Sequence, residues 1–329
     1  MFPDVPEFNF IDSLLQDAAE FKHEPPSSRS WLGAGDDCAI FDGWLVTKDL
    51  SVENTHFRLD WATPEQAVEK HIVSNVSDIS AMGGIPRIAI LGLCLNKNWS
   101  EETRVRIRKA FAQGFAKRGI ALIGGDTVAG EVGMFSTTLL GNLAGEKPLL
   151  RSNVQAGDNL YINGTIGKSG AGLWLLMNHP ESLSDFPTLV DYHLNPKICE
   201  SAGAELARLS ARSACMDISD GLSSELNHLA IASGVSIQID EELLPVDPEV
   251  QRLCERFGVN PLHFALNGGE EYELLFANSA TESIFRENAQ LGGVYRIGVA
   301  SDVSEATPVC MHSKSGDFVP VKPRAWSHL

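Results

Sequence analysis

Six aspartates stand at positions where a folded chain could gather them around one ligand. They follow glycine turns, end apolar strands or lie near a helix end, and they are Asp37, Asp49, Asp78, Asp126, Asp217 and Asp220. Strand ends and the turns beside them are where α/β proteins collect ligand-binding groups. Clustered carboxylates with few histidines or cysteines favour hard cations, and Mg²⁺ bound by carboxylates usually accompanies a polyphosphate. The pattern predicts a magnesium site that binds a polyphosphate.

Each of these aspartates also has a simpler explanation. A single aspartate at such a position is more often a solvated or capping residue, and Asp220 could N-cap the helix that LSSELNHLA predicts. The adjacent carboxylates of Asp36 and Asp37 repel one another unless solvent, a cationic side chain or a metal compensates them. The cluster as a whole is therefore the stronger signal.

The segment GKSGAG, residues 167–172, stands between a predicted strand and a predicted helix, as a phosphate-binding loop would. A Walker A loop requires a glycine five residues before Gly167, and the chain has Ile162 there. The backbone N–H groups of the turn could still contact an anion. A purely structural turn explains the glycines equally well.

The composition argues against several classes of partner. The chain has 329 residues and a formal charge of −17, without a stripe of Lys and Arg to neutralise nucleic-acid or membrane phosphates. The longest apolar stretch, around IAILGLCL, is too short to span a bilayer, and the N-terminus lacks the order of a signal peptide. Six cysteines without a CxxC pair favour reduced thiols. We therefore expect a cytoplasmic protein with no nucleic-acid and no membrane partner.

Strands and helices alternate along the first half of the chain. FDGWLVTKDL predicts one strand leaving the acidic turn, and a capping box at residues 63–66 opens a helix that runs to Gly83, with Asp78 one turn before its end. IAILGLCL predicts a buried strand, and a second helix follows over residues 100–119. IALIGG predicts a strand that ends at Asp126, and FSTTLLGNLAG predicts another. The first half is therefore α/β.

A second unit begins near RSNVQAGDNLYING, where a turn leads into a new strand. We place the domain boundary there, with one domain over residues 1–148 and another over residues 149–329. The later segments CMDISDGLSSELNHLA, VSIQID and GGEEYELLF repeat the order of a strand, an acidic turn and a helix or strand.

Eight segments of the chain together resemble the motifs of thiamine-monophosphate kinases, in the same order and at similar spacing. They are GAGDDCAI, TKDLSVENTHF, NVSDISAMGG, LIGGDTVAG, RSNVQAGDNLYING, DISDGLSSEL, LNGGEEYELLF and AWSHL. That family belongs to the superfamily of aminoimidazole-ribonucleotide synthetase and selenophosphate synthetase. The resemblance implies a two-domain α/β (α+β) fold and a homodimer whose N-terminal sheets pair into a β-barrel. It also implies that the first domain binds ATP and metal and dimerises, while the second completes the nucleotide and substrate site.

The resemblance implies a role for individual residues as well. Mg²⁺ contacts are implied at Asp37, Thr47, Lys48, Asp49, Asp78, Asp126, Asp217 and Asp220. ATP contacts are implied at Gly125, Asp126, Arg151 and Ser219. Thiamine monophosphate contacts are implied at His56, Glu270 and Trp326, where the carboxylate could face either the cationic thiazolium or the aminopyrimidine. Asp36 is expected to anchor the glycine turn rather than to bind metal.

The chain departs from the family pattern in two places. Residues 47–49 read Thr-Lys-Asp where Ser-Thr-Asp is usual, and residues 54–55 read Asn-Thr where the family has a glycine-rich step. If Thr47 and Asp49 face the metals, side-chain alternation directs Lys48 to the other face of its strand, and only its backbone carbonyl could contact a metal. The alternative is that Lys48 marks a homologue that binds nucleotide or thiamine phosphate without turnover.

The implied reaction transfers a phosphoryl group from ATP to thiamine monophosphate, giving ADP and thiamine diphosphate. The attacking phosphate oxygen is already ionised at neutral pH, so we expect no catalytic general base. Selenophosphate synthetase fits less well, because no cysteine precedes Cys38 ahead of the glycine-rich start. Aminoimidazole-ribonucleotide synthetase matches the terminal aromatic motif less well.

Overall fold

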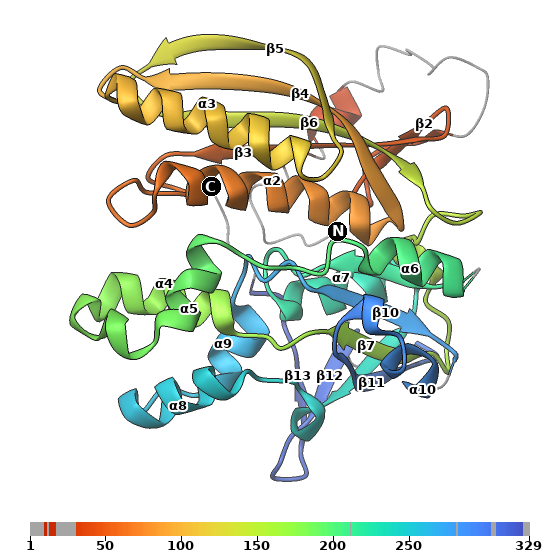
Figure 1. Ribbon diagram of the computed structural model, residues 1–329. Coiled ribbons are helices and arrows are strands. Elements are labelled where there is room, and N and C mark those ends of the chain that lie inside the picture. Colours follow the sequence, from red (N-terminus) through yellow and green to blue (C-terminus); the bar gives the residue numbers. More distant parts are fainter. Residues whose placement is uncertain are drawn as a thin grey trace.

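The protein folds into two units, each built from a sheet and the helices packed on it (Figure 1). The computed structural model describes residues 10–11, 13–17, 31–210, 212–280, 282–303 and 307–324. The first sheet ends at Leu143 and the second begins at Asn159, so the boundary predicted after residue 148 falls in the connection between them. No helix within the described ranges is long and apolar enough to cross a membrane.

The first sheet has six strands in the order β1-β2-β3-β6-β4-β5. They are β1 (Trp31–Leu32), β2 (Ala39–Phe41), β3 (Trp44–Val52), β4 (Gly84–Asn96), β5 (Ala121–Gly130) and β6 (Met134–Leu143). The single strand predicted for FDGWLVTKDL is wrong, because a turn at Asp42 and Gly43 separates β2 from β3. These two residues have φ angles of 49° and 83°, as a two-residue hairpin turn requires, and Asp-Gly is a favoured pair there.

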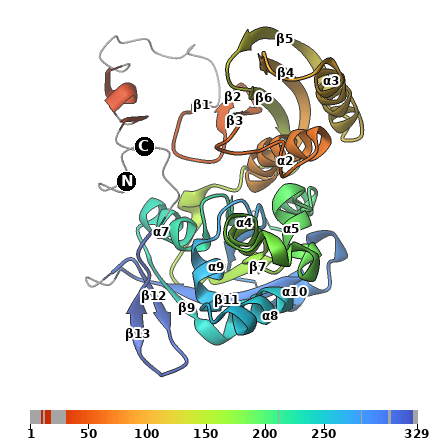
Figure 2. The same ribbon diagram turned by 90° about the vertical axis from the view of Figure 1, so that its left-hand side faces the viewer.

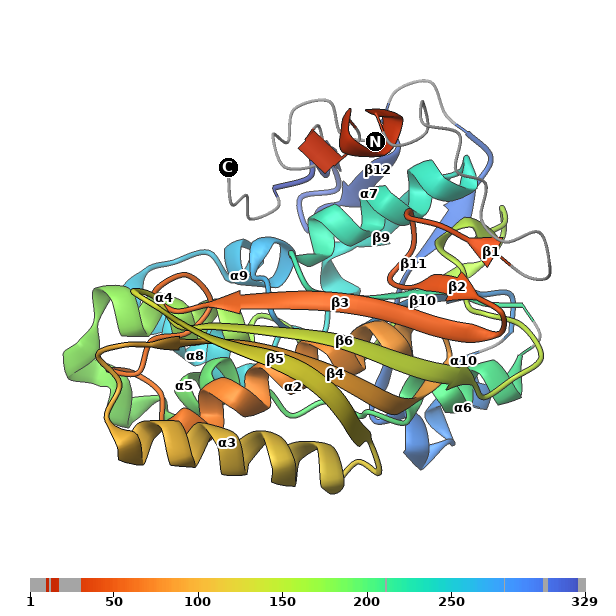
Figure 3. The same ribbon diagram turned by 90° about the horizontal axis from the view of Figure 1, so that it is seen from above.

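Helices α2 (Pro64–Ala81) and α3 (Glu101–Ala116) cover one face of this sheet (Figure 3). Thr63 and Gln66 form the predicted capping box of α2. Apolar side chains of both helices and of the inner sheet face form one core, which includes Ile72, Val76, Ile79, Phe111, Phe115, Phe135 and Leu139. The opposite face, called the open face below, carries exposed apolar side chains, namely Leu50, Ile90 and Val128.

The second sheet has seven strands in the order β13-β12-β9-β11-β7-β10-β8. They are β7 (Asn159–Asn163), β8 (Ala214–Asp217), β9 (Ser236–Asp240), β10 (Leu274–Asn278), β11 (Val294–Ser301), β12 (Val309–His312) and β13 (Phe318–Pro320). Its helices are α4 (Lys168–Asn178), α5 (Pro187–Leu194), α6 (Ala202–Leu209), α7 (Leu222–Ser233), α8 (Pro248–Phe257), α9 (Pro261–Asn267) and α10 (Glu282–Arg286), with short 3₁₀ turns η1 (Arg151–Asn153), η2 (Pro180–Asp185), η3 (Glu241–Leu243) and η4 (Ala289–Leu291).

Helix α2 lies between the two units and contacts both (Figure 2). Ala81, at its end, is buried in a cluster with Leu149 and Tyr161 of the second unit. The backbone N–H of Gly203 on α6 donates to Ser80 Oγ at 3.2 Å, and a side chain at Gly203 would clash with the Ser80 carbonyl. This close approach holds the end of α2, which carries Asp78, against the second sheet.

Candidate active site

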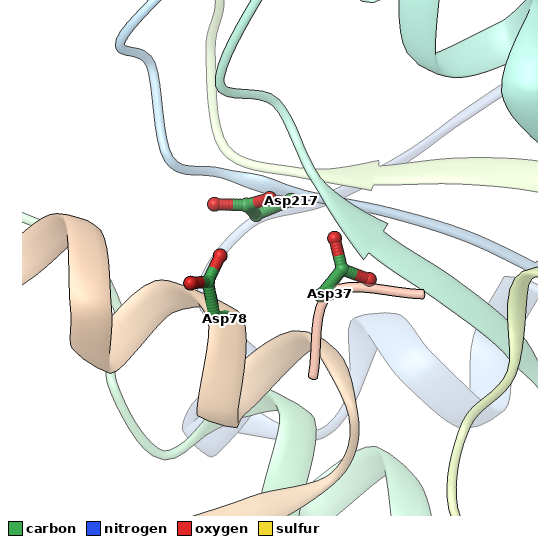
Figure 4. A group of neighbouring side chains, drawn as sticks. All are labelled: Asp37, Asp78 and Asp217. Carbon is green, nitrogen blue, oxygen red and sulfur yellow. The ribbon is translucent and has the colours of Figure 1, made fainter. Parts of the chain in front are cut away.

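Three of the predicted aspartates meet between the two units (Figure 4). Asp37 lies in the glycine turn before β2, Asp78 lies near the end of α2, and Asp217 ends β8. One oxygen from each carboxylate lies within 4.8 Å of the other two. The first unit therefore supplies two carboxylates and the second unit supplies one.

Neighbouring hydroxyl groups orient two of these carboxylates. The hydroxyl of Thr47 on β3 donates to Asp78 Oδ2. Ser77, fully buried on α2, donates through Oγ to Asp217 Oδ2 at 2.6 Å and so connects the two units. Asp49 lies two residues beyond Thr47 on the same face of β3, close enough for its charge to raise the pKa of Asp78.

Arg151, in η1, compensates part of the negative charge. Its Nη2 donates to Asp37 Oδ1 at 2.6 Å, and its backbone N–H donates to Asp36 Oδ1 at 2.9 Å. Burial raises the pKa of Asp36 to about 6, although the bond from the Arg151 backbone opposes this. Asp36 therefore ties the glycine turn to the start of the second unit, in keeping with an anchoring role.

Burying several carboxyl groups together raises their pKa values. Burial, and then the charge of Asp37, raises the pKa of Asp217 to about 8. Burial, followed by the charges of Asp49 and Asp217, raises the pKa of Asp78 well above its usual value. Burial also raises the pKa of Asp49. These groups cannot all ionise near pH 7 unless a cation joins them.

The site fits a hard divalent cation. Within the described part of the chain, Asp37 Oδ2 is buried and has no hydrogen-bond partner. The grouped donors are all carboxylate oxygens, which is the ligand type that Mg²⁺ prefers. A bound divalent cation would satisfy this oxygen and would lower the pKa values of Asp78 and Asp217.

Ser219 and Asp220 lie in the loop between β8 and α7. Asp220 is outside the group of three aspartates, and the alternative that it N-caps α7 is wrong, because Gly221 holds that position. The backbone N–H of Asp220 donates to Glu225 Oε1 at 2.9 Å. Glu225 is buried, and its other carboxylate oxygen has no hydrogen-bond partner in the described ranges. This acid, in the first turn of α7, was not predicted from the sequence.

Lys48 points away from the acidic site. Its neighbours Thr47 and Asp49 face α2, and the Lys48 side chain is exposed on the open face. There its Nζ donates to Ser136 Oγ of β6 at 2.6 Å. The side chain therefore does not enter the site, and a metal contact through its backbone carbonyl stays a prediction.

Gly125 and Asp126 are separated from the group of three aspartates in the same chain. They lie inside the edge strand β5, which continues to Gly130 instead of ending at Asp126 as predicted. Across β4 and β6, Asp126 is in register with Leu50, so its side chain lies on the open face. Gly125 passes so close to the Leu91 carbonyl that any side chain there would clash.

His56 and Glu270 are brought together by Lys70 of α2. Lys70 Nζ donates to Glu270 Oε2 at 2.6 Å and to the backbone carbonyl of His56 at 3.4 Å. The predicted substrate residue Trp326 lies outside the described residues. Lys70 was not predicted, although a lysine in the apolar middle of α2, about two turns before Asp78, was an available signal.

The segment GKSGAG is a structural turn. Gly167 precedes α4 with a φ of 93°, and the backbone N–H of Ser169 donates to Glu271 Oε1 at 2.9 Å. The carboxylate of Glu271 therefore occupies the helix start that a phosphate would need. Lys168 Nζ lies 3.6 Å from Glu273 Oε1 and 4.0 Å from the ring centre of Tyr192. The ammonium of Lys168 therefore also contacts groups of the protein itself.

Sequence profiles of known families match both units. The description "AIR synthase related protein, N-terminal domain" matches residues 35–143, and "AIR synthase related protein, C-terminal domain" matches residues 155–310. Together with the two-unit fold and the acidic site between the units, these matches define the class, and this chain is an AIR synthase related protein.

Within this class the chain is similar to thiamine-monophosphate kinases. The enzyme of Pyrococcus horikoshii is 36% identical over 87% of this chain and 92% of its own length. That of Mycobacterium tuberculosis is 34% identical over 82% of this chain and 79% of its own length. A solved structure described as AaThiL complexed with AMPPCP and TMP has a TM-score of 0.79 and 31% identity, covering 98% of this chain and 97% of that one. The chain belongs to the thiamine-monophosphate kinase family.

Proposed function

We propose that this protein transfers the γ-phosphoryl group of ATP directly to thiamine monophosphate, giving thiamine diphosphate and ADP. The observation that carries the proposal is the group of Asp37, Asp78 and Asp217, which is buried between the units and requires cations to ionise fully. Family membership supports the choice of substrates. The related AaThiL structure was obtained with AMPPCP and TMP.

The chemistry needs positioning and charge compensation more than proton transfer. The acceptor phosphate is ionised near pH 7, so no side chain has to act as a general base. Bound Mg²⁺ would supply positive charge that offsets the phosphates of both substrates. The residues proposed to hold it are Asp37, Asp49, Asp78, Asp217 and Asp220, with the Thr47 hydroxyl and the Lys48 carbonyl beside them and Asp126 as argued below.

Arg151 is the proposed cationic contact for ATP. Its guanidinium is anchored on Asp37, and its Nε has no hydrogen-bond partner within the described ranges although it is buried. A guanidinium with an unused donor can bind a phosphate oxygen through a charge-assisted hydrogen bond. The other proposed contacts are Gly125, Asp126 and Ser219 for ATP and His56 and Glu270 for thiamine monophosphate.

We infer that two copies of the chain complete the site together. Asp126 lies on the open face, away from the group of three aspartates in its own chain. The exposed side chains of Leu50, Ile90 and Val128 make that face apolar, and an apolar sheet face of this kind is a typical interaction surface. Pairing of two open faces would bury these side chains and could bring Asp126 of one copy to the carboxylates of the other.

Mixed dimers test this arrangement. Asp78→Asn and Asp126→Asn should each be inactive alone, but co-expression should restore about a quarter of wild-type turnover, because half of the dimers are mixed and each has one intact site. Asp78→Asn co-expressed with Asp217→Asn is the matched control and should stay inactive, since both residues belong to the same half-site. If the first pair also stays inactive, Asp126 does not act in the partner's site.

One assay tests the reaction itself. ADP release is followed with thiamine monophosphate, with thiamine, and without an acceptor, while thiamine diphosphate is quantified in parallel. We expect ADP and thiamine diphosphate in equal amounts with thiamine monophosphate only, and no reaction after Mg²⁺ removal. Equal ADP release without acceptor would identify a nucleotide hydrolase instead, and nucleotide binding without any turnover would identify a non-catalytic homologue.

A further inference from the structure

Lys70 is a buried cation placed directly against a carboxylate of the proposed substrate site. Its side chain is 9% exposed, that of Glu270 is 28% exposed, and the two form an ion pair of 2.6 Å between α2 of the first unit and a loop of the second. Lys70 also donates to the carbonyl of His56. It therefore contacts both described residues that are proposed to bind thiamine monophosphate.

The pair is electrically neutral. Burial favours a neutral Glu270, but the adjacent Lys70 ammonium, together with His193 and His56, outweighs burial and holds the pKa of Glu270 below its usual value. His193 lies 3.6 Å from the same carboxylate, and burial, followed by the charge of Lys70, lowers the pKa of His193 to about 3. His193 is therefore uncharged at neutral pH. Lys70 is therefore the lysine that forms an ion pair with Glu270, with His56 as a further nearby charge.

The carboxylate of Glu270 is also held in one orientation. Its backbone N–H donates to the Ser219 carbonyl at 2.6 Å, and its φ of 60° is in the left-handed region that non-glycine residues rarely adopt. Lys70 and His193 both lie against Oε2. Within the described ranges these side-chain contacts leave Oε1 without a hydrogen bond, and this oxygen remains available as an acceptor.

We propose that Lys70 is a positioning residue that makes Glu270 bind the amino group of the substrate's aminopyrimidine ring, rather than the positive charge of its thiazolium ring. A carboxylate already paired with an ammonium exerts little net attraction on a second cation. Its free oxygen still accepts a hydrogen bond, and an acceptor that a bound substrate covers rejects a group that cannot donate. This inference rests on the proposed function and names the part of thiamine monophosphate that Glu270 recognises.

The test compares two ligands by calorimetric titration in the presence of Mg²⁺ and a non-hydrolysable ATP analogue. The ligands are thiamine monophosphate and its analogue with a carbonyl oxygen in place of the ring amino group, which keeps the thiazolium charge. The wild type should bind thiamine monophosphate about tenfold more tightly than the analogue. Glu270→Gln should reduce this preference to about threefold or less, because an amide can accept from one ligand and donate to the other.

Lys70→Met distinguishes the two possible roles of Glu270, because the two roles predict opposite changes in the affinity for thiamine monophosphate. If Lys70 positions an acceptor, the variant binds thiamine monophosphate about tenfold more weakly and loses preference for it over the analogue, while Lys70→Arg restores both. If Glu270 attracts the thiazolium, removing the ammonium strengthens binding instead. Lys117→Met is the control, because it breaks a 2.6 Å lysine–carboxylate pair between the end of α3 and Glu69 of α2, a pair that does not include Glu270.

Three outcomes overturn the proposal, namely equal affinity of the wild type for both ligands, tighter binding by Lys70→Met, or unchanged affinity and preference in Lys70→Met. ATP-analogue affinity and circular dichroism show whether each variant is folded. Should Lys70→Met not fold, Lys70→Arg and Glu270→Gln still decide the question through the preference for the amino group. A wild type that binds the ATP analogue but neither thiamine compound would contradict the proposed function itself, whereas binding without preference contradicts only this inference.

Discussion

At the scale of residues, the site buries adjacent carboxyl groups whose ionisation is unfavourable until a cation binds them. Asp217 is buried beside Asp37 and Asp78, and its pKa of about 8 means that the folded chain holds a proton that the unfolded chain would release well below neutrality. Without a divalent cation, the free energy of unfolding therefore falls as the pH rises from about 4 to about 8. A cation bound at the carboxylates removes this dependence, because it stabilises their ionised forms.

Asp217→Asn should separate stability from activity. Without Mg²⁺ at pH 8 we expect the variant to be more stable than the wild type by about 2 kcal/mol, because the amide needs no proton. Its turnover should fall by roughly a hundredfold, about 3 kcal/mol of lost transition-state stabilisation. Thermal unfolding at pH 5 and pH 8, with and without Mg²⁺, measures the first effect, and the ADP assay measures the second. A variant that is both folded and fully active would refute the role of Asp217 in metal binding.

At the scale of elements, strand β3 and helix α2 each direct polar side chains of the site to one side and other side chains to the opposite side. β3 directs Thr47 and Asp49 toward α2 and directs Lys48 to the open face, because side chains alternate along a strand. α2 in turn directs Lys70 and Asp78 toward the second unit while its apolar side packs on the first sheet. The substitution at Lys48, which departs from the family pattern, therefore leaves the acidic face of β3 intact.

We expect Lys48→Thr to leave kcat and the Mg²⁺ dependence of ADP formation nearly unchanged. The variant loses the 2.6 Å contact with Ser136 on the open face but keeps the backbone carbonyl at position 48. A Mg²⁺ titration of both proteins is the measurement, and Asp49→Asn is the comparison that should change its midpoint. If Lys48→Thr shifts the midpoint strongly, the ammonium of Lys48 acts as a charge in the site.

At the scale of the whole molecule, the open face of the first sheet is the surface through which we propose that two copies pair. Ile90 is 41% exposed near the middle of this face, and a charge placed there would be buried by pairing of two sheets. We expect Ile90→Glu to be monomeric at micromolar concentration and inactive, while the wild type is dimeric. Sedimentation velocity measures the change. Ile231→Glu is the matched control, since Ile231 is 43% exposed on α7 of the second unit, and dissociation by both variants alike would argue against this interface.

The sequence alone determined the features that depend on near neighbours in the chain. The capping box at Thr63 and Gln66 predicted the start of α2, and strand alternation predicted the direction of Lys48. The order of the motifs predicted the family and its two-unit fold. These signals are readable because caps and alternation act over a few residues.

Only the tertiary structure decided which of the predicted groups meet. Asp37, Asp78 and Asp217 converge because the end of α2 packs on β8, whereas Asp126, in an equally glycine-rich motif, lies on the opposite face of its sheet. Lys70 pairs with a glutamate 200 positions away along the chain. Contacts of this kind depend on how helices and sheets pack after the chain has returned on itself, and a local pattern of residue types carries no record of that geometry.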